Sequence, residues 1–261
     1  MESMLEASTS SVSDTNPTAM GRVRAVIKQR RKRHERDRYI SWLYEQAQNG
    51  ASLEVIRKIG LIVAYFHLAF ADINRRALYY PNPTDDYMRA INAHTAEDGT
   101  HFRLLLSDFK VLGYDDVYKA SDILGILWSS DNLASRDLTY TFFELAVRNQ
   151  HPGIRYAIME VSEQQGNILF TAYFNLVKQI AANGHANSED FVFFGEKHLL
   201  LEQGHLVNQE IDEQALFDTI SLTPDEVDQA IRAVHAMWDA FERWHESILA
   251  TLSDFDRILP R

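Results

Sequence analysis

The stretch EKHLLLEQGHLVNQE, residues 196–210, places His198, Glu202 and His205 at steps of four and three along a leucine-rich segment. An α-helix turns about 100° per residue, so these three side chains share a narrow stripe. Imidazole nitrogens and a carboxylate oxygen are suitable ligands for a divalent metal ion. A solvated helix face with His and Glu four residues apart is the common alternative, and this stripe alone does not separate the two.

A second stripe lies in NAHTAEDGTHFRLLL, which holds His94, Glu97, Asp98 and His101. Offsets of three, four and seven put all four side chains on one helix face. The same face continues into apolar residues and should therefore reach the core. Buried imidazoles and carboxylates cost free energy unless they are paired or bound to a ligand, which strengthens the metal hypothesis.

A third segment, IRYAIMEVSEQQGNILF, carries Glu160 and Glu163 on one face, with Tyr156 and Phe170 above and below them. By itself this pattern also fits a buried polar network. Together, the three segments offer enough oxygen and nitrogen donors for two metal ions in a helical bundle.

The chain has no cysteine, so thiolate zinc sites, iron–sulfur clusters and cysteine nucleophiles are excluded. His and carboxylate donors without thiolate favour iron, with manganese as the alternative. The H-E-x-x-H order of zinc peptidases is absent, because Glu202 follows His198 by four residues.

These motifs resemble the heme-oxygenase-like diiron oxidases and oxygenases, over roughly residues 85–210. In that family one core helix supplies a carboxylate and a His, a second a lone Glu, and a third H-x3-[D/E]-x2-H. The resemblance implies a metal-ligand set of Glu97, His101, Glu163, His198, Glu202 and His205. It also implies two ferrous ions that activate O2, and a small organic acid, amine or amino-acid-like substrate.

The first element departs from the family pattern, because Glu97 precedes His101 by four residues rather than two or six. His94 or Asp98 could therefore take the place of Glu97. Glu160 is an alternative to Glu163, or a residue that orients a ligand histidine.

The function has a second interpretation, in which the same fold has no dimetal site and serves as a cofactorless enzyme or an interaction scaffold. A heme oxygenase would use a single axial His, whereas four histidines cluster with glutamates here. The arginine-rich segment after residue 21 could contact an anionic partner, although a solvated helix face is the simpler interpretation.

Helical periodicity and the absence of a period-two pattern predict an all-α bundle of seven or eight helices. We expect a disordered tail over residues 1–20, rich in Ser and Thr, and a single heme-oxygenase-like helical domain over 21–261. Predicted helices include one after Gly50, one over 84–112, two covering 116–128 and 135–149, one to about 182, one capped by Ser188 and one beginning at Thr223.

The last predicted helix carries His235, Asp239, Glu242 and His245, which we interpret as a solvated face. Four aromatic residues near the ligand motifs could line a dry substrate pocket: Phe102, Tyr156, Phe170 and Tyr173. Most aromatic residues of this kind serve the core.

The net charge of −11 argues against nucleic acid as a partner. The sequence contains neither a membrane-length apolar run nor a secretory signal pattern, so we expect a cytoplasmic protein. Its expected partners are a small-molecule substrate and O2, and a homodimer is the working assumption for the oligomeric state.

Overall fold

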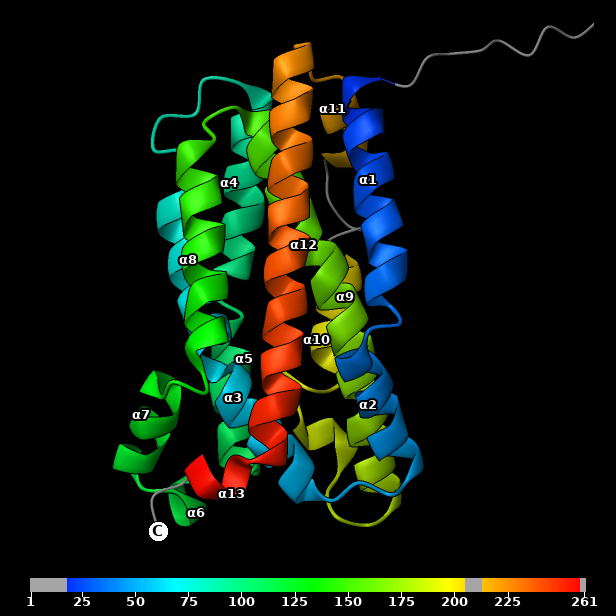
Figure 1. Cartoon of the computed structure of the whole chain (residues 1–261), viewed down its shortest axis with the longest axis vertical. Helices are drawn as coiled ribbons and strands as arrows, with labels where there is room; N and C mark the ends of the chain where they lie inside the picture. The colour runs from blue at the N-terminus through cyan, green and yellow to red at the C-terminus, as the bar shows by residue number, and fades with distance from the viewer. Residues whose placement is uncertain (1–17, 205–212, 259–261) are drawn as a thin grey trace, which may run out of the picture.

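The computed structural model describes residues 18–204 and 213–258, and these ranges form an all-α bundle without a β-strand. The predicted all-α class is confirmed. Figure 1 shows the long helices running side by side, with α6, α7 and α13 gathered at one end. The segments are α1 (Ala19–His34), α2 (Arg38–Gln48), α3 (Leu53–Asp72), the π-helix η1 (Ile73–Leu78), α4 (Asp86–Asp98), α5 (Phe102–Val111), α6 (Tyr114–Val117), α7 (Ala120–Trp128), α8 (Leu133–Arg148), α9 (Pro152–Ala182), the 3-10 helix η2 (Ser188–Asp190), α10 (Glu196–Gly204), α11 (Glu213–Asp218), α12 (Pro224–Ser253) and α13 (Phe255–Ile258).

Helices α9 and α12 are the longest, and both begin with strong start signals. Pro152 is the first residue of α9, and the ring of the cap residue His151 accepts a hydrogen bond from the N–H of Gly153. Helix α12 begins with a capping box in which Thr223 and Glu226 accept hydrogen bonds from each other's backbone N–H. These signals fix where the two central helices start.

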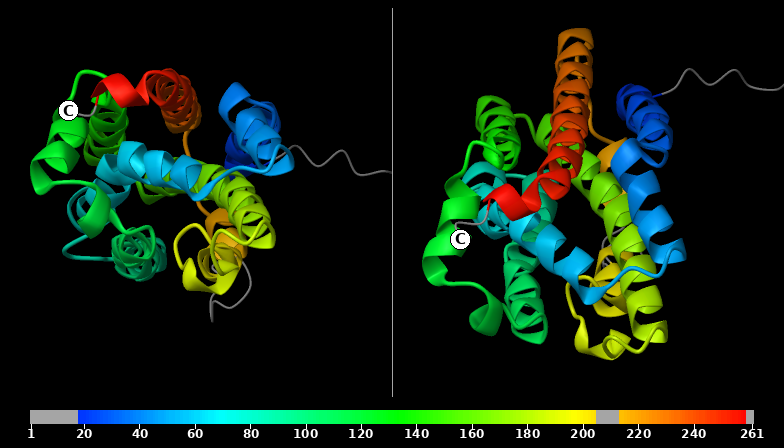
Figure 2. Two further views of the ribbon diagram at one scale, coloured as in Figure 1. Left: turned by 90° about the horizontal axis from the view of Figure 1, so that it is seen from below. Right: turned by 60° about the horizontal axis from the view of Figure 1, so that its bottom comes forward.

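The core is built around the contact of α9 with α12, and helices α1, α2, α8 and α10 also pack against one or both of them. Figure 2 shows the arrangement end-on and tilted forward. Trp238 and Trp244 of α12 and Tyr173 of α9 are fully or almost fully buried there. Burial of such large apolar side chains is the main force that holds the helices together.

The segment predicted as one helix over 84–112 is two helices. Helix α4 ends at Asp98, α5 begins at Phe102, and a turn joins them in which the N–H of His101 donates to the carbonyl of Asp98. A second break, at residues 35–37, separates α1 from α2, where Asp37 caps α2 by accepting from the N–H of Ile40. Breaks of this kind make the helical segments more numerous than the predicted seven or eight.

The folded part begins slightly earlier than predicted. Helix α1 starts at Ala19, and Met20 is fully buried, two and one residues before the predicted boundary at 21. Residues 1–17 of the predicted tail lie outside the described ranges. Within those ranges, no helix combines the length and apolar character needed to cross a bilayer.

Two arginines of α1 are paired with acidic residues of α12. Arg30 lies 2.6 Å from Asp239, and Arg33 lies 2.5 Å from Glu242. Asp239 and His235 are exposed, as expected for a solvated face. Part of the basic face of α1 therefore pairs within the molecule, which favours the simpler interpretation of this segment.

Candidate metal centre

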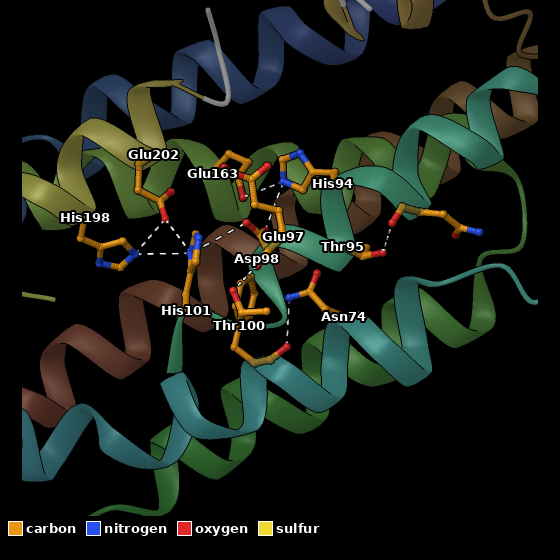
Figure 3. Close-up of polar contacts among 12 residues, drawn as sticks. Asn74, His94, Thr95, Glu97, Asp98, Thr100, His101, Glu163, His198 and Glu202 are labelled. Carbon is orange, nitrogen blue, oxygen red and sulfur yellow. Dashed lines mark hydrogen bonds and ion pairs between the residues drawn. The ribbon is translucent and has the colours of Figure 1, made fainter. Parts of the chain in front are cut away.

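Six side chains converge between α4, the turn after it, α9 and α10. They form two groups of three donors, and within each group the ligand atoms lie within 4.8 Å of one another. The first group is His94, Asp98 and Glu163, and the second is His101, His198 and Glu202. Figure 3 shows His198 and Glu202 pointing toward His101, with His94 and Glu163 facing each other beside them.

The first group is centred on the His94 ring. Its Nε2 lies 3.2 Å from Oδ2 of Asp98 and 3.3 Å from Oε1 of Glu163. His94 and Asp98 are four residues apart on α4, so the helix itself brings them together. Glu163 comes from the middle of α9, which packs against α4.

The second group is centred on one carboxylate oxygen, Oε1 of Glu202. It lies 3.1 Å from Nε2 of His198 and 3.2 Å from Nδ1 of His101. The two imidazole nitrogens are 3.4 Å apart. Nδ1 of His101 is also 3.9 Å from Oδ1 of Asp98, which joins the two groups into one continuous cluster.

These distances match the edges of a metal coordination polyhedron. Consider two ligand atoms that each lie about 2.1 Å from the same metal ion. They are about 3.0 Å apart when the ligand–metal–ligand angle is about 90°, and about 3.4 Å apart when it is tetrahedral. Hydrogen bonds between a cationic donor and a carboxylate are shorter, about 2.7–2.9 Å. The donor set and its spacing therefore fit divalent metal ions in both groups.

A buried loop fixes the orientation of His198. The carboxylate of Asp108 is fully buried and accepts hydrogen bonds from the N–H groups of Val192, Phe193 and Phe194, at 2.7 to 3.0 Å. The carbonyl of Phe193 then lies 3.1 Å from Nδ1 of His198. This contact holds the Nδ1–H tautomer and directs Nε2 toward Glu202, the arrangement typical of a metal-ligating imidazole.

Three carboxylates share a small buried volume, and their pKa values reflect this crowding. Burial and the nearby charge of Asp98 raise the pKa of Glu163 to about 8, despite the opposing effect of His94. Burial also tends to raise the pKa of Glu202, but the hydrogen bonds from His101 and His198 outweigh it, and the net shift is downward. A bound cation would relieve the repulsion that keeps Glu163 from ionising.

The histidines of the cluster respond in the opposite sense. Burial lowers the pKa of His94, yet Asp98 and Glu163 outweigh that effect and the net shift is upward. The pKa of His101 is also raised, because Glu202 and Asp98 outweigh the cost of its burial. Without metal, protons on these imidazoles balance the carboxylates.

A cavity of about 40 Å³ adjoins the cluster. It has room for roughly three water-sized groups. Its lining combines cluster residues with an aromatic wall from α3, α5, α9, α12 and the loop before α10: Phe66, Phe70, Phe102, Phe170, Phe193, Phe241 and Trp244. Such a wall excludes water from the side of the cluster that faces the cavity.

Several predicted ligands are brought together as expected. Glu163 belongs to the cluster, whereas Glu160 is bound instead by the amide of Gln164, at 2.7 Å. His101, His198 and Glu202 form the second group. His205 lies outside the described residues, so its prediction stays untested.

The carboxylate of the first element differs from the one we favoured. The side chain of Glu97 is exposed and belongs to neither group, and the buried carboxylate of α4 is Asp98. His94 and Asp98, which were alternatives to Glu97, both lie in the cluster. The reason is that α4 ends at Asp98 and directs this residue toward His101 in the turn.

The four aromatic residues predicted to line a pocket divide into two pairs. Phe102 and Phe170 line the cavity. Tyr156 stacks on Phe217 at a centroid distance of 3.7 Å, and the hydroxyl of Tyr173 pairs with that of Tyr39 at 3.0 Å. The two tyrosines therefore serve the core.

Sequence reasoning missed three polar residues of the cavity wall, His67 of α3 and Ser162 and Gln165 of α9. Burial lowers the pKa of His67 to about 3, so its imidazole is neutral. A single His inside the apolar run AYFHLAF was a usable signal, because a polar side chain in such a run is rarely placed there by packing alone. Nothing in the sequence marks Gln165.

A third group of His and carboxylate donors consists of His34, Asp37 and His245. His245 was predicted to lie on a solvated face, but it is buried. The reason is that α12 packs against α2, whose N-terminal cap residue Asp37 contacts His245. Nδ1 of His245 is in direct hydrogen-bond contact with Oδ2 of Asp37.

No protein-family model matches the chain, and no curated protein matches it significantly. The family resemblance therefore stays a prediction that depends on the ligand motifs.

Proposed function

We propose that the protein is a non-heme diiron enzyme that uses O2 to oxidise a small organic acid, amine or amino-acid-like molecule. The observation that carries this proposal is the pair of adjacent three-donor groups, His94–Asp98–Glu163 and His101–His198–Glu202, beside an aromatic cavity. Nitrogen and oxygen donors without thiolate favour iron or manganese.

The arrangement of the donors supports two ions rather than one, because they form two separate groups of three. Three carboxylates, Asp98, Glu163 and Glu202, are buried or nearly buried together, and their charge must be compensated. Divalent cations supply that compensation. Ferrous ions in such a site supply the electrons for activating O2.

The side chains around the cluster would position it and keep it dry. Asp108 holds the loop of Phe193, and the Phe193 carbonyl orients His198. The aromatic wall contributed by Phe170, Phe241 and Trp244 excludes water and leaves room for a small substrate next to the metal ligands.

The proposal is tested by oxygen consumption. Protein loaded with ferrous iron under anaerobic conditions should consume O2 when air is admitted, and small amines, amino acids or organic acids should stimulate the rate. The His198→Ala variant, which lacks one ligand of the second group, should show no iron-dependent rate.

Two outcomes would oppose the proposal. Stoichiometric heme binding with a Soret band, and no effect of ferrous iron, would assign the protein to heme chemistry. A folded chain that binds no metal at all would favour the alternative of a cofactorless enzyme or an interaction scaffold.

A further inference from the structure

A chain of hydrogen bonds leads from the start of α2 to the wall of the cavity. Oδ2 of Asp37 contacts Nδ1 of His245, and Nε2 of His245 lies 3.0 Å from Nε2 of Gln165. His245 and Gln165 are almost fully buried, at 2% and 1% exposure, and Gln165 lines the cavity beside the metal centre. The chain therefore connects a fixed carboxylate to an amide side chain in the cavity wall.

Asp37 sets the direction of every donor in this chain. Burial tends to raise the pKa of Asp37, but the hydrogen bonds from His245 and from the N–H of Ile40 outweigh it, and the net shift is downward. A carboxylate only accepts hydrogen bonds, so Nδ1 of His245 carries the proton. The NH2 group of Gln165, which can only donate, lies against Nε2 of His245, so this ring nitrogen is the acceptor.

The contact with His245 uses one N–H of the Gln165 amide and leaves its oxygen without a partner among the residues that the structure describes. Its Oε1 is buried and accepts no hydrogen bond from any residue of the described ranges. An amide oxygen that is buried without a donor is destabilising, so a ligand that supplies a donor at this position gains affinity.

We propose that Gln165, oriented by Asp37 through His245, presents Oε1 to the cavity and selects substrates that carry an amine N–H beside the metal centre. This inference narrows the substrate class of the proposed function and rests on the cavity being its substrate site. A carboxylate would face the lone pairs of Oε1 and be repelled, whereas an amine or ammonium group would donate to it.

The aromatic wall suits the same class of substrate. Phe66, Phe241 and Trp244 line the cavity together with Gln165. Their ring faces attract an alkylammonium group and accommodate its alkyl part, while they offer a carboxylate no hydrogen-bond donor apart from the indole N–H of Trp244, which donates to Ser135 at 2.8 Å. An amine therefore finds both an acceptor and an apolar wall.

The Asp37→Asn variant is the sharpest test, because the structure dictates how Asn would sit. The oxygen of the new side chain must keep accepting from the N–H of Ile40, now 2.8 Å from Oδ1, to cap α2. Its NH2 group then faces His245 and donates to Nδ1, which moves the ring proton to Nε2. Gln165 must turn its oxygen toward His245, and its NH2 group then faces the cavity.

The measurement is the ratio of the dissociation constants of ethylamine and acetate, determined by NMR titration of the metal-free folded chain. Wild-type protein should prefer ethylamine. The Asp37→Asn variant should shift the ratio toward acetate by about tenfold or more, the effect of exchanging one hydrogen-bond acceptor for a donor. Gln165→Leu, which removes the amide altogether, should shift the ratio in the same direction by a smaller factor.

The cluster carboxylates attract ethylamine equally in all three proteins, so only the change in the ratio is diagnostic. A ratio that is the same in wild type and Gln165→Leu would overturn the inference, as would a folded wild-type chain that binds no ethylamine at millimolar concentration. If Asp37→Asn does not fold, the Gln165→Leu comparison decides alone. Because no metal is present, failure of the diiron proposal leaves this result unaffected, and the two can be judged separately.

Discussion

The metal-centre groups and the group of His34, Asp37 and His245 use the same side-chain types in different ways. In the metal centre three carboxylates converge, and the central atom of each group, Nε2 of His94 or Oε1 of Glu202, lies 3.1 to 3.3 Å from the other two donors. In the other group a single carboxylate makes a direct hydrogen bond to His245, whose second nitrogen meets Gln165.

The third histidine of that group, His34, completes the contrast. Burial lowers the pKa of His34 to about 3, so the ring stays neutral, and it packs on Trp238 at a centroid distance of 4.4 Å. The two regions show that proximity of His and carboxylate is not sufficient for a metal site. Excess buried negative charge, from three carboxylates instead of one, distinguishes the metal centre from this hydrogen-bonded cluster.

The largest expected effect is a difference between two buried histidines. His198→Ala removes a ligand of the second group and should abolish metal binding at that position, together with iron-dependent oxidation. His34→Ala removes a ring from the other group and should leave the iron content per folded chain unchanged. Iron analysis of both variants, with circular dichroism to confirm helicity, checks the pair. Equal iron loss in both would break the distinction between the two regions.

A comparison of Glu160 and Glu163, which lie one turn apart on α9, tests which of the two is a metal ligand. Glu163→Ala should leave fewer than about two irons bound at any practical concentration, because it removes a first-group ligand. Glu160→Ala should reach full occupancy, since Glu160 contacts Gln164 and belongs to neither group. An iron titration of each variant measures the effect, and the reverse ranking would show that Glu160 is the ligand.

The loop that orients His198 should matter for metal affinity although it holds no ligand. Asp108→Asn places an NH2 group against backbone N–H donors, because the carboxylate now accepts from three of them. We expect iron affinity to fall about 10- to 100-fold while binding stays measurable. Competition with a chelator measures the iron dissociation constants of the variant and the wild type. Unchanged affinity would show that Asp108 does not orient His198 for metal binding.

The pH dependence of metal affinity tests the charge argument. The pKa of about 8 at Glu163 means that this group carries a proton below that pH in the metal-free protein. Metal binding must displace this proton together with those held by His94 and His101, so affinity should rise with pH, by about tenfold per unit for each proton released. Calorimetry in buffers of different ionisation enthalpy should detect the released proton. A flat affinity between about pH 6 and 8 would contradict the crowding of the carboxylates.

The sequence predicted what depends on short-range spacing. His198 and Glu202 share a helix turn, and so do His94 and Asp98, so their proximity follows from the period of the helix. The choice between Glu97 and Asp98 could not be made, because both lie near the His94 face and only the end of α4 at Asp98 decides between them.

Long-range contacts were beyond sequence reasoning. Asp37 and His245 are separated by 208 residues, and their pairing depends on how α2 packs against α12. The stripe on α12 was therefore assigned to solvent along its whole length, although it becomes buried at His245. Gln165 was missed for a related reason. Its proposed role depends on the contact of its amide with His245, which is 80 residues away in the sequence.

The most direct test of the metal centre is the iron content of the folded wild-type chain after anaerobic ferrous loading and desalting. The two groups, His94–Asp98–Glu163 and His101–His198–Glu202, predict about two irons per chain. The absence of retained iron, or retention of heme in its place, would contradict the central claim that these six residues form a non-heme dimetal site.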